Sequence, residues 1–269
     1  MSTRDETLEI RVGDHRIAGT MIVPDTLMPG VLFLHGWGGN QAQYAARARE
    51  IAALGCACLT VDLRGHAGTA REQASVTREH NLLDAVAAYD RLAGEVAVDD
   101  DQIAVVGSSY GGYLATILTT MRPVKWLGLR APALYKDSDW DLPKLALRQV
   151  QKLEDYRRNV LEPNANRALR SAAAFRGDVL IVESGNDRII PHAVIQSYRN
   201  ACADAHSLTY RTIEGADHGL TDPSCRQAYT TLLVNWITEM IAGKRADDAT
   251  SGKRLQEAMK TSVATISTR

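Results

Sequence analysis

The sequence lacks the features by which several classes of protein are recognised. With 31 Lys and Arg against 32 Asp and Glu, the 269-residue chain has a formal net charge of −1. That balance gives no electrostatic reason to expect nucleic acid or an anionic membrane as a partner. No run approaches the roughly 20 apolar residues of a spanning helix, so we expect no membrane insertion. The amino end, Met1 to Glu6, has no apolar core, which predicts no signal peptide and a cytoplasmic protein.

Neither the cysteines nor the clustered carboxylates have the spacing of a metal site. The four cysteines include no Cys-x-x-Cys pair, so a zinc site is not expected. Cys56 and Cys58 lie two apart on a predicted strand and are interpreted as small buried residues that cannot readily form a disulfide bond. Asp99, Asp100 and Asp101 lack the alternating ligand spacing of a calcium loop. A solvated turn before the next strand is favoured over a cation site, and we expect no metal.

Short apolar runs alternate with amphipathic segments along most of the chain. This alternation predicts an α/β fold with a parallel sheet and helices on both faces. Gly13-Asp14 predicts a hairpin between the first two strands. The predicted strands span 8–12, 15–23, 31–34, 56–61, 103–106, 126–130, 179–182 and 207–213, and the main predicted helices span 42–54, 77–92, 191–203 and 223–242.

One segment departs from this rhythm. Residues 133–176 are polar and helix-prone, and they predict an inserted lid or cap of two or three short helices. The core would then comprise 1–132 and 177–243. Residues 244–269 predict a tail, a short docked helix or a segment that binds a partner.

The segment Gly107-Ser108-Ser109-Tyr110-Gly111 follows an apolar run and precedes a helix-prone one. Gly-x-Ser-x-Gly between a strand and a helix is the pattern of a nucleophile elbow, in which the serine is held on a sharp turn. Glycines are needed on both sides because side chains there would collide with neighbouring backbone. The motif alone is common in turns, so other residues must decide its meaning.

A serine nucleophile needs a base and an orienting carboxylate, and the sequence offers both. Asp187 follows the strand at 179–182, and His218 follows the strand at 207–213. The carboxyl ends of parallel strands share one edge of a sheet, so these residues are expected near Ser109. Asp217 is the alternative acid, but adjacent residues in a loop rarely face each other.

Five ordered segments together resemble an α/β-hydrolase-fold serine hydrolase across about residues 8–242. They are His35-Gly36-Trp37-Gly38-Gly39, Asp62-Leu63-Arg64-Gly65-His66, Gly107 to Tyr113, Gly185-Asn186-Asp187 and Ala216-Asp217-His218-Gly219. The segment from Gly107 to Tyr113 is also similar to prolyl-oligopeptidase-type peptidases and feruloyl-type esterases. The resemblance implies Ser109 as nucleophile, Asp187 as orienting acid and His218 as base. It further implies an eight-stranded, mostly parallel sheet with an antiparallel strand near the start.

The glycine-rich loop after the third strand is a candidate source of hydrogen bonds to the oxyanion that acyl transfer creates. That oxyanion needs donors placed in advance, and the N–H of Tyr110 supplies one. By family resemblance the second donor is the N–H of Trp37, whose side chain would line the pocket. A plain glycine turn is the alternative. His35 is expected to shape this loop, and His66 to be structural, with a contact to substrate as the alternative.

The composition of the predicted lid indicates what kind of substrate to expect. It is rich in charged residues and lacks the apolar stripe of a lid that opens on lipid, which favours small soluble substrates. Tyr135 and Trp140 are candidate substrate contacts or packing residues, and Arg130 is a further candidate contact.

The sequence therefore predicts a cofactor-free serine hydrolase that cleaves a small soluble carboxylic ester. A peptidase, amidase, thioesterase or acyl transferase of the same fold is the alternative, as is a binding protein without catalysis. No nucleic-acid partner is expected, and a homodimer is left open.

Overall fold

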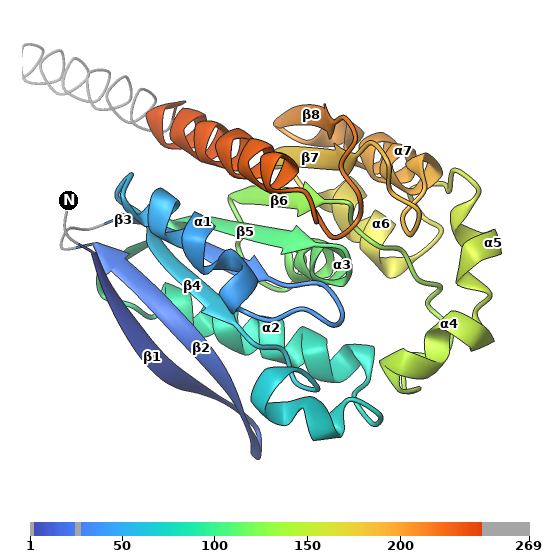
Figure 1. The fold of residues 1–269 in the computed structure, drawn as a ribbon, viewed down its shortest axis with the longest axis horizontal. Helices are drawn as coiled ribbons and strands as arrows, with labels where there is room; N and C mark the ends of the chain where they lie inside the picture. Colours follow the sequence, from blue (N-terminus) through green and yellow to red (C-terminus); the bar gives the residue numbers. More distant parts are fainter. Residues whose placement is uncertain (1–2, 25–27, 244–269) are drawn as a thin grey trace, which may run out of the picture.

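The computed structural model describes residues 3–24 and 28–243 of the chain (Figure 1). The predicted tail or docked helix over 244–269 lies outside the described residues. Among the helices within these ranges, none combines the length and the apolar character that crossing a bilayer requires.

Eight strands form one sheet in the order β1-β2-β4-β3-β5-β6-β7-β8. Strand β2 runs antiparallel to both of its neighbours, and the pairs from β4 to β8 are parallel, which confirms the predicted sheet. The strands are β1 (Thr3–Val12), β2 (His15–Pro24), β3 (Met28–Leu34), β4 (Ala57–Val61), β5 (Val98–Ser108), β6 (Trp126–Arg130), β7 (Asp178–Ser184) and β8 (Ser207–Ile213).

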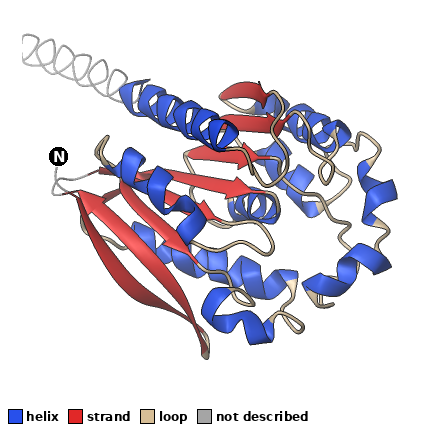
Figure 2. Ribbon diagram, in the orientation of Figure 1, coloured by secondary structure: helices blue, strands red, loops and turns tan. Residues whose placement is uncertain are grey.

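Helices cover both faces of this sheet (Figure 2). Along β3, Val31 and Phe33 pack on one face while Leu32 and Leu34 pack on the other, as the period of two in a strand requires. The first face is covered by α1 (Ala42–Ala52) and the helix over residues 223–243. The second face is covered by α2 (Arg78–Ala93), α3 (Tyr110–Leu118), α6 (Arg167–Ala174) and α7 (His192–Ala201).

The strand order reverses at β3, which lies between β4 and β5. The chain runs outward from β3 to β4 and then returns to the other side of β3 as β5. At such a switch point, the loops that leave the carboxyl ends of the two strands diverge and open a crevice. The loop after β3 and the turn after β5 are the two segments that the sequence singled out for catalysis.

The segment between β6 and β7 forms the predicted short helices. They are a 3₁₀ turn η2 (Lys144–Ala146), α4 (Leu147–Val150), α5 (Leu153–Arg157) and α6. Helix α6 packs against α3 and α7, so it belongs to the helical layer of the core. The part before α6 is tied to α2, because Arg78 donates to the carbonyl oxygens of Lys136 and Ser138, each at 2.6 Å.

One local expectation is wrong. Asp99, Asp100 and Asp101 belong to β5 rather than to a turn before it, because β5 begins at Val98 and pairs with Met28 and Pro29 ahead of a register shift. Their carboxylate oxygens lie within 4.8 Å of one another, and two of the three residues are exposed.

Candidate active site

Ser109 occupies the sharp turn between β5 and α3. Its backbone has φ 52° and ψ −116°, a conformation that a non-glycine residue adopts only under strain. A Cβ at Gly107 would lie 2.4 Å from the carbonyl oxygen of Gly111, and one at Gly111 would lie 2.1 Å from that of Leu34. Both glycines are therefore required by the close backbone approach that holds the serine up from the sheet.

His218 connects Ser109 to a carboxylate. Its Nε2 lies 3.0 Å from Ser109 Oγ, and its Nδ1 lies 2.7 Å from Asp187 Oδ2. The other carboxylate oxygen of Asp187 accepts from the backbone N–H groups of Ile189 and Ile190 at 2.8 and 2.9 Å. The three side chains come from loops after β5, β7 and β8, which places them at one edge of the sheet.

The two candidate acids, Asp187 and Asp217, have different surroundings. Burial by itself would raise the pKa of Asp187, but hydrogen bonds from His218, Ile190 and Ile189 outweigh it and lower the pKa below its ordinary value. Asp217 is exposed and instead accepts hydrogen bonds from the hydroxyl and N–H of Thr221. Those bonds lower the pKa of Asp217 as well, and they engage both of its carboxylate oxygens with Thr221.

The loop after β3 packs directly against the serine. A Cβ at Gly36 would lie 3.3 Å from that of Ser109, and a turn is closed by the N–H of Gly39, which donates to Gly36 O at 2.9 Å. The N–H groups of Trp37 and Tyr110 donate to no acceptor among residues 3–24 and 28–243. Tyr110 opens α3, where the first backbone N–H groups have no partner within the helix.

Two buried histidines hold this loop in place. His35 donates from Nδ1 to Gly36 O at 2.8 Å and accepts at Nε2 from the N–H of Leu63 at 3.0 Å. His66 accepts at Nε2 from the N–H of Gly38 at 3.1 Å. Burial is the main cause that lowers the pKa of both rings, that of His35 to about 4, so both are neutral near neutral pH. Their role is structural, as the sequence predicts.

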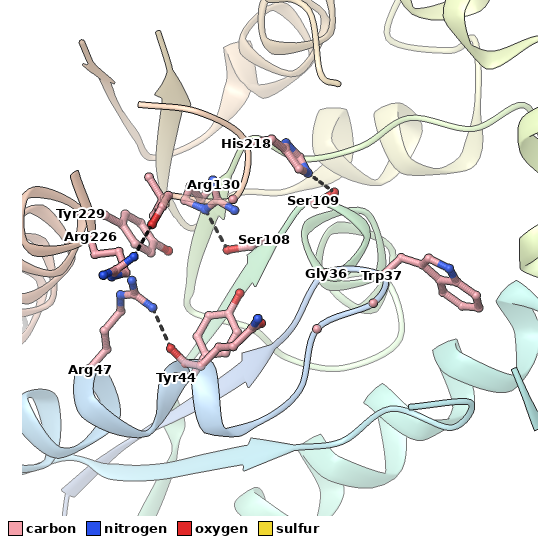
Figure 3. Close-up of a pocket in the computed structure, with 15 residues that line it drawn as sticks. Gly36, Trp37, Tyr44, Arg47, Ser108, Ser109, Arg130, His218, Arg226 and Tyr229 are labelled. Atoms are coloured by element: carbon pink, nitrogen blue, oxygen red, sulfur yellow. Dashed lines mark hydrogen bonds between the residues drawn. The ribbon is translucent and has the colours of Figure 1, made fainter. Parts of the chain in front are cut away.

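Two cavities meet at Ser109, and both are also lined by Trp37 and His218. The first, of about 420 Å³, extends past Ser108 between α1 and the helix over 223–243 (Figure 3). The second, of about 460 Å³, lies between the Asp187 loop and the inserted segment. Buried Lys144 of that segment holds its ammonium 4.5 Å from the centre of the Trp37 ring. The serine hydroxyl thus lies where a substrate can extend in two directions.

Comparison with known protein families assigns the chain to one of them. A family model described as "Alpha/beta hydrolase family" matches residues 31–229. The chain belongs to the α/β hydrolase family.

Among relatives of this α/β hydrolase is an uncharacterized protein of Mycobacterium tuberculosis (strain CDC 1551 / Oshkosh), 31% identical over 192 residues. The match covers 71% of this chain and 63% of the relative, so the chain spans less than two thirds of that protein's length.

Solved structures share the fold at low identity. Est1E of Butyrivibrio proteoclasticus with bound ferulic acid is 18% identical, has a TM-score of 0.63, and is matched over 89% of this chain and 99% of its own. The acylaminoacyl peptidase of Pyrococcus horikoshii is 17% identical, with a TM-score of 0.65 over 88% of this chain and 41% of its own.

Two residues that the sequence marked as candidate substrate contacts lie elsewhere in the α/β hydrolase. Tyr135 is 4% exposed and packs edge-on against the rings of Tyr110 and Tyr113. Trp140 donates from Nε1 to Glu79 of α2 at 2.6 Å. Neither lines a cavity at Ser109, so we assign both to packing between the insertion and the core.

Arg130 does line the first cavity, as the sequence suggested, together with three residues that the sequence reasoning missed. Arg47, Arg226 and Tyr229 come from α1 and the helix over 223–243. A signal for Arg47 exists: Tyr44, Arg47, Ala48 and Ile51 form the buried stripe of α1, and an arginine on such a stripe is unusual. Nothing comparable marks Arg226, which is exposed.

Proposed function

We propose that this α/β hydrolase cleaves small soluble carboxylic esters, with Ser109 as nucleophile, His218 as general base and Asp187 as orienting acid. The observation that carries the proposal is the chain of hydrogen bonds from Ser109 Oγ through the His218 ring to Asp187, at 3.0 and 2.7 Å. A nucleophile, a base and an orienting carboxylate joined in this way are the arrangement that activates a serine.

The first half of the reaction forms an acyl-enzyme. His218 Nε2 accepts the hydroxyl proton as Ser109 Oγ bonds to the carbonyl carbon, and the carbonyl oxygen becomes an oxyanion. The N–H groups of Trp37 and Tyr110 stabilise that charge, an effect worth about 3 kcal/mol for each well-placed donor. The bond to the leaving alkoxide oxygen then breaks, and that oxygen takes the proton from Nε2.

The second half repeats these steps with water. His218 takes a proton from a water molecule that attacks the acyl carbon, and Ser109 leaves with that proton restored. One ester and one water thus give one acid and one alcohol. The charge of Asp187 stabilises the imidazolium in both halves and fixes Nδ1 as the donor to the carboxylate. These steps need no metal or organic cofactor.

The inserted segment supports a soluble substrate. We propose residues 1–132 and 177–243 together with α6 as the core, and the part of the 133–176 insertion before α6 as a cap that walls the second cavity. That wall carries Lys144, Arg148, Arg157 and Arg158, which favours a water-soluble substrate over a lipid.

The same triad chemistry serves amides and thioesters, since only the leaving group differs. The fold shared with a peptidase keeps an amide substrate as the second candidate. A panel of p-nitrophenyl acyl esters, a feruloyl ester, a thioester and an aminoacyl-anilide, assayed with wild type and Ser109→Ala, separates them. Ester turnover that falls on the order of a millionfold in the variant supports the proposal. Turnover of the anilide alone would replace it with a peptidase.

A further inference from the structure

The first cavity contains two buried arginines close to the serine. Arg47 is 9% exposed and Arg130 is 7% exposed, and both line the cavity together with Ser109 (Figure 3). Arg47 comes from α1 and Arg130 from the end of β6, so two separate elements direct guanidinium groups to one space. Arg226 adds a third at the rim.

Neither buried guanidinium is paired with a carboxylate within the described part of the chain. Arg47 donates to Thr230 Oγ1 at 3.1 Å and to Gln43 O at 3.0 Å, and it lies 4.9 Å from the ring centre of Tyr229. Arg130 donates to the hydroxyls of Ser108 and Ser184, both at 3.2 Å. All of these partners are neutral.

Two other buried arginines, Arg64 and Arg78, have different surroundings. Arg64 is bonded to Asp84 at 2.6 Å, with 5% and 0% of the two side chains exposed. Arg78 has no carboxylate, but its two terminal nitrogens donate to backbone carbonyls and it lines neither cavity at Ser109. Arg47 and Arg130 differ from both because they face a cavity with only neutral partners, as Arg157 does at the second cavity.

An unpaired buried cation is costly, and an anion bound in the cavity would offset that cost for Arg47 and Arg130. Asp217 is affected electrostatically by Arg130, yet it is exposed and bonded to Thr221. The positive charge is local, because the whole chain has a net charge of −1. The rim residue Arg226 also donates only to carbonyl oxygens, those of Leu220 and Thr221.

We propose that the first cavity binds an oxyanion carried by the substrate, a carboxylate or a phosphate, through Arg47 and Arg130. This inference rests on the proposed ester hydrolysis and names its substrate class: an ester with an anionic group on one side of the scissile bond. Guanidinium groups suit this task because their planar N–H donors match carboxylate and phosphate oxygens.

A pair of substrates that differ only in charge tests the proposal without any substitution. The charged ester is p-nitrophenyl hydrogen adipate, and the neutral one is methyl p-nitrophenyl adipate. Ser109→Ala gives the background rate of hydrolysis. We expect wild-type kcat/KM to be about ten- to a hundredfold higher for the charged ester, the effect of charged hydrogen bonds. In Arg47→Gln and in Arg130→Gln, this ratio falls towards one. Arg16→Gln, on an exposed residue of β2, keeps the wild-type ratio.

A binding measurement separates this inference from the proposed reaction. Adipate or inorganic phosphate is added to Ser109→Ala, and the unfolding temperature is followed. An increase that Arg47→Gln or Arg130→Gln abolishes in that background supports the anion site even if no ester is cleaved, and the stronger of the two anions identifies the group. Serine-dependent turnover with a ratio of one or below, or no increase with either anion, would overturn the inference.

Discussion

Acid should destabilise this protein through one buried histidine well before its carboxylates titrate. His35 is held neutral between Gly36 O, which accepts from Nδ1, and the N–H of Leu63, which donates to Nε2. A proton added at Nε2 would face that N–H and break the bond. Burial lowers the pKa of His35 from 6.5 to about 4.

The sign of the effect follows from these two values. Between about pH 6.5 and pH 4 the unfolded chain binds a proton at this residue and the folded chain does not, so stability falls as pH falls. One pKa unit corresponds to about 1.4 kcal/mol, so the free energy of unfolding drops by about 2 kcal/mol at pH 5 and about 3 kcal/mol near pH 4. The lowered pKa of Asp187 changes the free energy of unfolding only below about pH 3.8, the ordinary pKa of an aspartate, which is outside this window.

Urea unfolding followed by tryptophan fluorescence, at about pH 7.5 and about pH 5, measures this difference. His35→Gln should be less stable than wild type at the higher pH and should lose less stability on acidification. A smaller dependence remains because the pKa of His66 is lowered in the same direction. His15→Gln, with a side chain about half exposed, is the matched control and should keep the wild-type dependence. An equal loss in His35→Gln and wild type would refute the reasoning.

Three further substitutions test other parts of the structure. Asp187→Asn should lower kcat for the best ester by about ten-thousandfold through the wrong histidine tautomer, and a near-normal rate would point to another acid. Asp84→Asn leaves Arg64 buried without its partner and should cost about 3–5 kcal/mol in urea unfolding; a loss under about 1 kcal/mol would contradict the buried pair. Gly111→Ala places a Cβ 2.1 Å from Leu34 O and should abolish activity or folding, whereas wild-type turnover would contradict the elbow geometry.

Much of the fold could be predicted because the central strands are continuous apolar runs. The predicted strand 126–130 coincides with the central strand β6, and the predicted strand 207–213 coincides with the edge strand β8. The prediction misses the first residues of two strands: β1 begins at Thr3 instead of residue 8, and β5 begins at Val98 instead of residue 103. Arg4, Asp5 and Glu6 carry no apolar alternation, and they become a strand by pairing with β2.

The candidate triad could be predicted because strand ends determine where loops meet. Ser109, Asp187 and His218 follow three parallel strands of one sheet, so topology alone brings them to the same edge. The cavity walls could not be predicted in this way. Arg47 lies on a helix far along the chain from its hydrogen-bond partner Thr230, and only the packing of two helices on one face brings them together. The position of Trp140 against Glu79 likewise depends on how the insertion folds back onto α2.

The most direct test of the central claim is covalent labelling by a fluorophosphonate, with the modified residue identified by mass spectrometry. An activated serine attacks the phosphorus, displaces fluoride and retains the phosphonyl group on Oγ. We expect one stoichiometric label on Ser109, absent in Ser109→Ala and formed much more slowly in Asp187→Asn. A folded wild-type protein that remains unlabelled, or is labelled at another serine, would contradict it.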